Sequence, residues 1–190
     1  MSLAARLSRH MAGTVVGIVA DRVLGEPPAF LHPVAGFGRA MGLIEDRAYE
    51  PTREAGIRHA VTGAALGLIG GRLLRSTAVA SYVSVAGRGL GAAAHDVRGA
   101  LAAGDLEAAR ARLPALVGRD PSVLDEGGIS RAVVESVAEN AVDAVVAPAL
   151  WAALGGAAGA TTYRAANTLD AMVGHHSDRY EEFGWASARL

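Results

Sequence analysis

Apolar residues run along this chain in long stretches separated by short polar segments. The apolar stretches cover residues 3–20, 59–71, 76–87, 130–163 and 161–173, and a shorter helix is expected over 34–49. Prolines at positions 27, 28 and 33 forbid a continuous helix after the first stretch, and Gly174 suits the end of the last one. No segment has the pattern of a convincing strand. The chain is therefore predicted to have an all-α fold.

A polar, Arg-rich connector of about residues 95–129 separates the apolar stretches. Within it, residues 105–117 predict a short amphipathic helix. Asp105 suits the N-cap, and one face of this helix carries Leu106, Ala109, Leu113 and Leu116. We expect residues 1–190 to form a single helical domain that includes this connector.

Length alone does not decide whether the apolar stretches cross a membrane. A spanning helix needs about 20 apolar residues. Only the charge-free run 144–163 reaches that length directly, and Pro148 and Gly155–Gly156 interrupt it. The other charge-free runs have 11 to 13 residues, which suits buried helices of a soluble protein.

Glycine spacing favours the membrane. Small-xxx-small patterns occur at Gly13/Gly17, Gly63/Gly67/Gly71, Gly87/Gly91 and Gly155/Gly159. In lipid, close backbone approach at such positions holds helices together, whereas each interior glycine of a soluble helix costs about 1 kcal/mol relative to alanine. A GC-rich gene that inflates Gly and Ala would give the same composition. The prediction is a multi-pass membrane helical bundle with glycine-rich helix packing.

Composition excludes several function classes. The formal net charge of −1 argues against a nucleic-acid binder that works by neutralising phosphates. The chain has no cysteine, which excludes disulfides, thiolate zinc sites and cysteine nucleophiles. All 18 basic residues are arginine, so there is no P-loop lysine. Any phosphate must be bound by arginine, helix N-termini or a metal held by carboxylates.

The segment VVESVAENAVDAVVAP, residues 133–148, carries acids in an apolar setting. Glu135, Glu139 and Asp143 are four residues apart, so they lie along one slowly drifting stripe of a helix, and Asn140 joins this face. A carboxylate in a dry environment is costly unless it is paired, protonated or bound to a cation. The alternative is the solvated face of an amphipathic helix. We expect the stripe to line a site.

Other polar groups interrupt apolar segments. Asn167 and Asp170 share a helical face and could orient a hydroxyl group or bind a cation through oxygen. His175, which follows the helix end, suits hydrogen bonding or proton transfer better than a zinc site. A proline-rich loop presents Asp21, Arg22 and His32, although a plain capping turn would also explain them. Arg119, beside Asp120, suits an anionic ligand or a surface salt bridge.

Five segments together resemble a known family: DRVLGEPP…LHPV, GRD, ESVAENxxDAVVAP, YRAANTLDAMVGH and DRYxxFGWASARL. The chain is similar, from about Gly17 to Leu190, to the CobD/CbiB family of cobalamin biosynthesis, the adenosylcobinamide-phosphate synthases. This resemblance implies a multi-pass protein of the inner (cell) membrane and an ATP-dependent amide ligase. Its substrates would be the corrinoid adenosylcobyric acid and aminopropanol or its phosphate. Family members continue beyond the last segment, so the chain is expected to cover about their N-terminal two thirds.

Roles for individual residues are a hypothesis that we build on this resemblance. Mg²⁺ with the nucleotide would be held by Glu139, Asn140 and Asp143. The expected catalytic residues are Glu135, Asp170 and His175, of which Asp170 or His175 would deprotonate the incoming ammonium. Substrate and phosphate binding is expected from Asp21, Arg22, His32, Arg119, Asp120, Asn167, Arg179 and Tyr180.

Two readings of another class stay open. A non-catalytic membrane scaffold or sensor for late corrin-pathway enzymes would need no ordered carboxylate cluster. A transporter would also carry acids within its apolar helices. The expected partners are the lipid bilayer, other corrin-pathway membrane proteins and further copies of the chain, and no nucleic acid.

Overall fold

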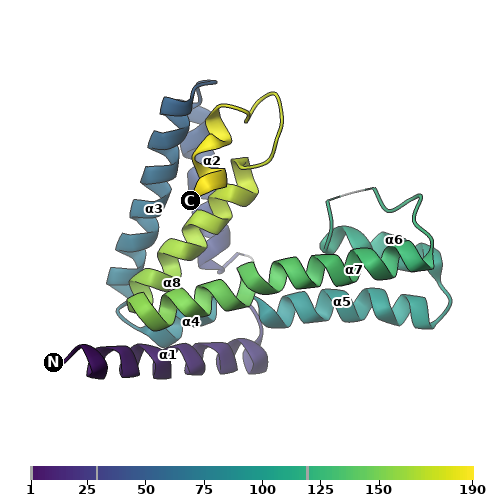
Figure 1. Ribbon diagram of the computed structural model, residues 1–190, viewed down its shortest axis with the longest axis horizontal. Helices are drawn as coiled ribbons and strands as arrows, with labels where there is room; N and C mark the ends of the chain where they lie inside the picture. The colour runs from purple at the N-terminus through teal and green to yellow at the C-terminus, as the bar shows by residue number, and fades with distance from the viewer. Residues whose placement is uncertain (1, 29, 119) are drawn as a thin grey trace. The chain divides into compact units, whose positions relative to one another are not determined.

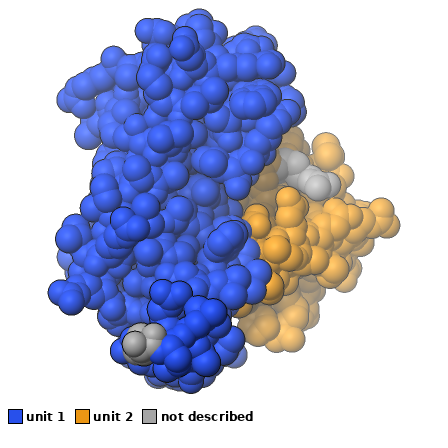
Figure 2. Space-filling model, turned by 60° about the vertical axis from the view of Figure 1, so that its left-hand side comes forward, with its two compact units in different colours: residues 1–85, 147–190 blue, residues 86–146 orange. Residues whose placement is uncertain are grey.

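The computed structural model describes residues 2–28, 30–118 and 120–190, so Arg119, an expected phosphate-binding residue, lies outside the described residues. All regular structure within these residues is helical, which confirms the all-α prediction (Figure 1). Backbone packing divides the chain into two compact units (Figure 2). Unit 1 comprises residues 1–85 and 147–190, and unit 2 comprises residues 86–146.

Unit 1 contains five α-helices and two short 3-10 turns among its described residues. They are α1 (Leu3–Leu24), α2 (Pro33–Ala48), α3 (Arg53–Leu74), α4 (Thr77–Ser84), α8 (Ala147–Val173), η3 (Phe183–Trp185) and η4 (Ser187–Arg189). Side-chain caps start most of these helices, with Ser2, Thr52 and Ser76 each accepting a bond from the backbone N–H three residues on. The first helix extends to Leu24, beyond the predicted end at residue 20, and stops at Gly25, whose φ is 77°.

Glycine allows two helix pairs of unit 1 to approach at backbone distance. α3 packs on α8 through Gly63, Gly67 and Gly71, and a Cβ at Gly71 would collide with the Ala157 carbonyl of α8. The Thr161 hydroxyl donates to the Gly67 carbonyl across this contact, at 2.7 Å. α1 packs on α4 in the same way, through Gly13 and Gly17. We call these two contacts the glycine seams.

Unit 1 has small residues inside and large apolar residues outside. Its buried apolar side chains are chiefly alanines of α3, α4 and α8. On the outer faces of α1 and α3, Val15 is 59% exposed, Ile69 51% and Leu73 76%. Small residues between helices and large aliphatic ones on the periphery are typical of helices packed within lipid.

The longest apolar run of the chain is bent. Among the described residues, one helical run, 126–173, is long and apolar enough to cross a membrane by its length and composition. Gly156 interrupts its α8 portion with φ 64° and ψ −148°, a conformation that glycine adopts at little cost. The chain changes direction there (Figure 1), and the His10 ring of α1 packs against this glycine.

Unit 2 is built around a core of larger aliphatic residues. Its elements are α5 (Gly87–Ala102), α6 (Leu106–Arg112), η1 (Leu113–Ala115), α7 (Glu126–Ala141) and the π-helical turn η2 (Val142–Val146). Val97, Leu113 and Ile129 are fully buried, and the predicted face of the amphipathic helix packs into this cluster. Asp105 caps α6 as expected, accepting a bond from the Ala108 N–H at 2.9 Å.

Pro148 accounts for the π-helical turn before it. Proline has no N–H for the carbonyl of residue 144, and its ring crowds that carbonyl. The helix widens into η2, and the Ala144 carbonyl accepts instead from the Ala86 N–H at 3.0 Å. Asp143 therefore lies in a type of irregular turn that is often found at functional sites.

Candidate functional site

A cleft of about 500 Å³ in unit 2 collects most of the predicted acidic stripe. One wall is α7, which contributes Glu135, Glu139 and Asn140. The other is the segment 116–118, which leads towards Asp120 along the chain. We call this the α7 cleft. Both glutamates are exposed to solvent within it, so a ligand in the cleft can reach both carboxylates.

Ser136 holds the two walls of the α7 cleft together. Its hydroxyl donates to the Leu116 carbonyl at 2.6 Å, and the side chain is 6% exposed. The amide nitrogen of Asn140 donates to the Ser136 carbonyl at 2.9 Å and to its hydroxyl oxygen at 3.1 Å. With its nitrogen engaged by α7, Asn140 has its carbonyl oxygen left to accept a bond or contact a cation.

Asp143 and Asp120 lie at the two ends of the predicted acidic region. Asp143 is half-buried in η2, one turn beyond Asn140. Asp120 is exposed and forms a tight turn, in which the Ser122 N–H donates to its carboxylate at 2.9 Å. Hydrogen bonds from the backbone and side chain of Ser122 lower the pKa of Asp120. In the described parts of the chain, no three His, Cys, Asp or Glu residues lie close enough together to hold a metal ion.

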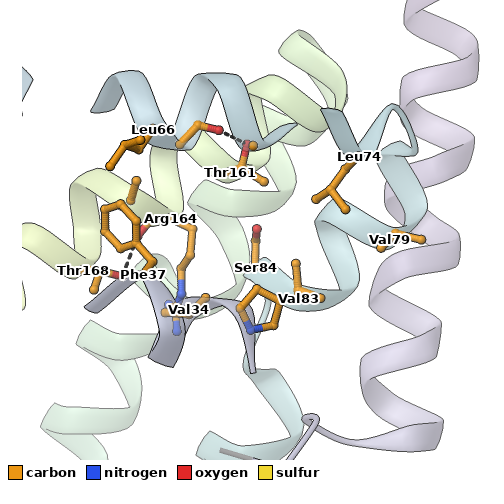
Figure 3. Close-up of a pocket in the computed structure, with 14 residues that line it drawn as sticks. Val34, Phe37, Leu66, Leu74, Val79, Val83, Ser84, Thr161, Arg164 and Thr168 are labelled. Atoms are coloured by element: carbon orange, nitrogen blue, oxygen red, sulfur yellow. Dashed lines mark hydrogen bonds between the residues drawn. The ribbon is translucent and has the colours of Figure 1, made fainter. Parts of the chain in front are cut away.

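The proline-rich loop of unit 1 leads to a second, mostly apolar pocket of about 330 Å³ between α2, α3, α4 and α8 (Figure 3). Asp21 is buried near the end of α1, whereas Arg22 is exposed. His32 caps α2 by accepting the Val34 N–H on its Nδ1 at 3.2 Å. Burial lowers the pKa of His32, the nearby charge of Arg164 lowers it further, and Glu26 opposes both.

Arg164 brings charge into this apolar pocket. Its side chain extends from α8 towards Val34 (Figure 3), and its Nη1 donates to the Asn167 side chain at 3.3 Å. Arg164 is a site residue that the sequence analysis did not single out. The sequence signal for Arg164 is its position four residues before Thr168, which places the two residues on one face of α8. The Thr168 hydroxyl donates to the Arg164 carbonyl at 2.7 Å.

Asp170 and His175 lie around the end of α8. Asp170 is exposed, and its backbone carbonyl accepts the Gly174 N–H at 2.7 Å. A Cβ at Gly174 would collide with the Asp170 carboxylate, so glycine is needed for this close approach. His175 is exposed and meets the Tyr180 ring edge-on, with the ring centroids 5.0 Å apart.

Arg179 and Tyr180 converge on a residue that the sequence did not single out. Glu45 of α2 is 6% exposed. It accepts hydrogen bonds on Oε1 from Arg179 Nη2 at 2.9 Å, from Arg179 Nε at 3.2 Å and from the Tyr180 hydroxyl at 2.9 Å. A sequence signal for Glu45 did exist. Phe37, Met41, Glu45 and Tyr49 are four residues apart, and Glu45 is the one acid on this apolar helix face.

Known proteins match nearly the full length of this chain. A profile of the family described as CobD/Cbib protein matches residues 14–190. The chain is 44% identical over 188 residues to the cobalamin biosynthesis protein CobD of Mycobacterium tuberculosis, covering 94% of this chain and 60% of the relative. It is 44% identical over 192 residues to the protein of that name from Chromobacterium violaceum, covering 92% and 61%. For Halalkalibacterium halodurans the identity is 38% over 198 residues, covering 95% and 61%.

The chain thus spans about three fifths of the length of these relatives. No solved structure matches it.

Proposed function

Because this chain belongs to the CobD/Cbib protein family, we propose that it acts in cobalamin biosynthesis as part of an ATP-dependent amide ligase. The ligase joins adenosylcobyric acid to aminopropanol or aminopropanol phosphate and yields adenosylcobinamide or its phosphate. The observation that carries the proposal is the α7 cleft, which is lined by Glu135, Glu139 and Asn140.

The donor set of the α7 cleft fits Mg²⁺ bound together with a nucleotide. Mg²⁺ prefers oxygen ligands, keeps several waters and is often held by one or two carboxylates plus substrate phosphates. Glu139 and the Asn140 carbonyl oxygen would supply the protein ligands, and Asp143 follows one turn later. Bound there, Mg²⁺ would offset the negative charge of a transferring phosphoryl group. Glu135 would orient the waters that remain on the ion.

Other residues predicted from the sequence are proposed for the acid–base and anion-binding roles. The corrinoid carboxylate would first take the γ-phosphoryl group of ATP to form an acyl phosphate. The amine substrate arrives as an ammonium, and Asp170 or His175 would accept its proton so that the nitrogen can attack the acyl carbon and release phosphate as the amide forms. Both side chains are exposed and able to reach a solute. Glu45 already offsets the charge of Arg179, so we assign phosphate binding to Arg22 and Arg119.

Asp21, His32, Asn167 and Tyr180 complete the substrate-binding set, and Asp120 is assigned to it with Arg119. His32 and Asn167 both lie near Arg164, which we add to the set. A carboxylate or phosphate of the substrate is the group that this arginine would recognise.

We propose that unit 1 lies in the inner membrane and that its chain crosses the bilayer more than once. The support is the exposed aliphatic surface of α1 and α3 combined with the glycine seams. Arginines flank the apolar centre of α3 at Arg58 and Arg72, where long basic side chains can extend to the lipid headgroups.

The test is Glu139→Gln, which keeps the size of the side chain and removes its charge. The detergent-solubilised chain should bind a non-hydrolysable ATP analogue in a Mg²⁺-dependent manner, and the substitution should weaken this binding by roughly tenfold or more. The equivalent change in the full-length Mycobacterium tuberculosis relative should slow cobinamide formation. Glu126→Gln, an exposed acid in the first turn of α7, is the matched control. Unchanged Mg²⁺-dependent binding in the Glu139 variant would contradict the assignment, and no nucleotide binding by the unaltered chain would favour the scaffold reading.

A further inference from the structure

Glu45 is a buried carboxylate that the proposed chemistry does not use. It lies on α2, and its bonding partners Arg179 and Tyr180 follow more than 130 positions later in the sequence. A buried carboxylate is costly unless its charge is compensated and its oxygens are hydrogen-bonded. Here one guanidinium and one phenol supply the compensation, so the polar cluster fixes the segment after α8 onto α2.

The surrounding rings hold this cluster in one geometry. The Arg179 guanidinium lies 4.1 Å from the centroid of the Tyr49 ring, and the Tyr49 hydroxyl donates to the Arg179 carbonyl at 2.7 Å. Phe183 is 1% exposed beneath Tyr49 and Tyr180. A planar guanidinium that is both stacked and bonded twice to one carboxylate has little freedom to rotate.

Tyr180 carries the effect of Glu45 to His175. Its hydroxyl donates to Glu45, and its ring meets the His175 ring at an interplanar angle of 85°. Burial and the bond to Glu45 both raise the pKa of Tyr180, so its hydroxyl stays a donor at neutral pH. His176, the next residue, contacts Glu181 instead, at 3.0 Å.

We propose that Glu45 is a positioning residue for the amide ligase, which fixes Tyr180 and through its ring orients the imidazole of His175. The inference rests on the proposed function, in which His175 is a candidate base. Glu45 acts through its neighbours, because the residue is only 6% exposed and its Oε1 is engaged by Arg179 and Tyr180. The arrangement matters for rate, since small misplacement of a reacting group can cost on the order of 10²-fold.

The first measurement is independent of activity. The chain is labelled at histidine, and the ring resonances of His175 are assigned by their loss in His175→Gln. Ring current from Tyr180 should displace them from those of His176, which serves as the internal reference for an exposed histidine. Glu45→Gln should move the His175 resonances towards the reference, and Tyr180→Leu should do so completely. His175 resonances that stay in place in both variants would overturn the proposal.

The second measurement is kinetic and uses the equivalent positions of the full-length relative. Glu45→Gln should lower kcat by about tenfold, because His175 is no longer held in the orientation for proton transfer, and it should raise KM only as far as Tyr180, which is assigned to substrate binding, is displaced. Asp46→Asn, a change of the adjacent exposed acid of α2, is the matched control and should leave both constants unchanged. Full activity of His175→Gln would remove His175 from the proposed mechanism, while the resonance measurement would still decide whether Glu45 orients it. A KM effect alone in Glu45→Gln would also overturn the positioning role.

Discussion

The imidazole of His32 combines a structural bond with a titratable group. Its Nδ1 accepts the Val34 N–H at the start of α2, so the ring proton must be on Nε2 and the ring must be neutral. Burial and Arg164 lower the pKa of His32, in agreement with this requirement. Protonation would put a hydrogen on Nδ1 and break the cap.

We therefore predict that His32 makes the fold sensitive to mild acid. The folded state binds the proton more weakly than the unfolded state, where the pKa is about 6.5, so stability is lost as the pH falls below that value. His32→Asn should remove this loss while keeping a good N-cap. Thermal unfolding in detergent, followed by circular dichroism from neutral to acidic pH, would show it. Identical pH profiles for the two proteins would contradict the prediction.

Adjacent glycines of α3 have opposite surroundings. A Cβ at Gly70 would meet nothing within 4 Å, whereas a Cβ at Gly71 would collide with the Thr161 side chain and the Ala157 carbonyl. Both positions are in the helix interior, so both substitutions by alanine gain the same helix propensity. Comparing the two substitutions therefore separates the effect of helix propensity on stability from the effect of helix packing.

We predict that Gly70→Ala stabilises unit 1 by up to about 1 kcal/mol and that Gly71→Ala destabilises it by about 1–3 kcal/mol through overpacking at the seam. Unfolding of the two variants by denaturant in the same detergent would measure the difference. Equal effects would mean that the α3–α8 seam is not held at backbone distance.

The helices themselves could be predicted, because caps and breakers are local signals. Asp105 as the N-cap and Gly174 as the residue after α8 are both observed. Glycine spacing was a weaker guide. Gly67 packs at backbone distance, but Gly91 and Gly155 have nothing within 4 Å of an added Cβ. Spacing shows that a partner could approach, and only the tertiary structure shows whether one does.

Part of the candidate site could be predicted from the sequence, and part could not. Glu135, Glu139 and Asn140 lie in one cleft as their helical spacing indicates, because all three come from one helix. Glu45 was missed because its partners Arg179 and Tyr180 are distant in sequence. The bend at Gly156 was also beyond local reasoning. Proline and glycine mark where a helix can break, but the His10 ring that packs against Gly156 comes from another helix, distant in the sequence.

On the scale of the whole molecule, unit 2 is an insertion within the sequence of unit 1. Its two ends are joined by the bond from the Ala86 N–H to the Ala144 carbonyl. Insertions of this kind are tolerated where the ends of the inserted segment lie close together. Unit 2 also has a core of its own, in which Val97, Leu113 and Ile129 are fully buried.

We predict that residues 86–146 fold as an isolated fragment in water, whereas unit 1 closed by a short linker requires detergent. Because the fragment is small, its stability should be only a few kcal/mol. Circular dichroism and size-exclusion chromatography without detergent would test this. Leu113→Ala, which removes a fully buried side chain, should abolish cooperative unfolding. A fragment that is unfolded or aggregated at all concentrations would refute the prediction.

The two glycine seams are completed at different moments of synthesis. α1 and α4 are both translated before unit 2, so their seam can close before unit 2 is made. α3 must wait for α8, and the whole of unit 2 is translated between them. Until α8 is made, the glycine face of α3 at Gly67 and Gly71 has no helix to pack against. The insertion machinery or chaperones that bind the nascent chain must therefore prevent this face from packing against another helix.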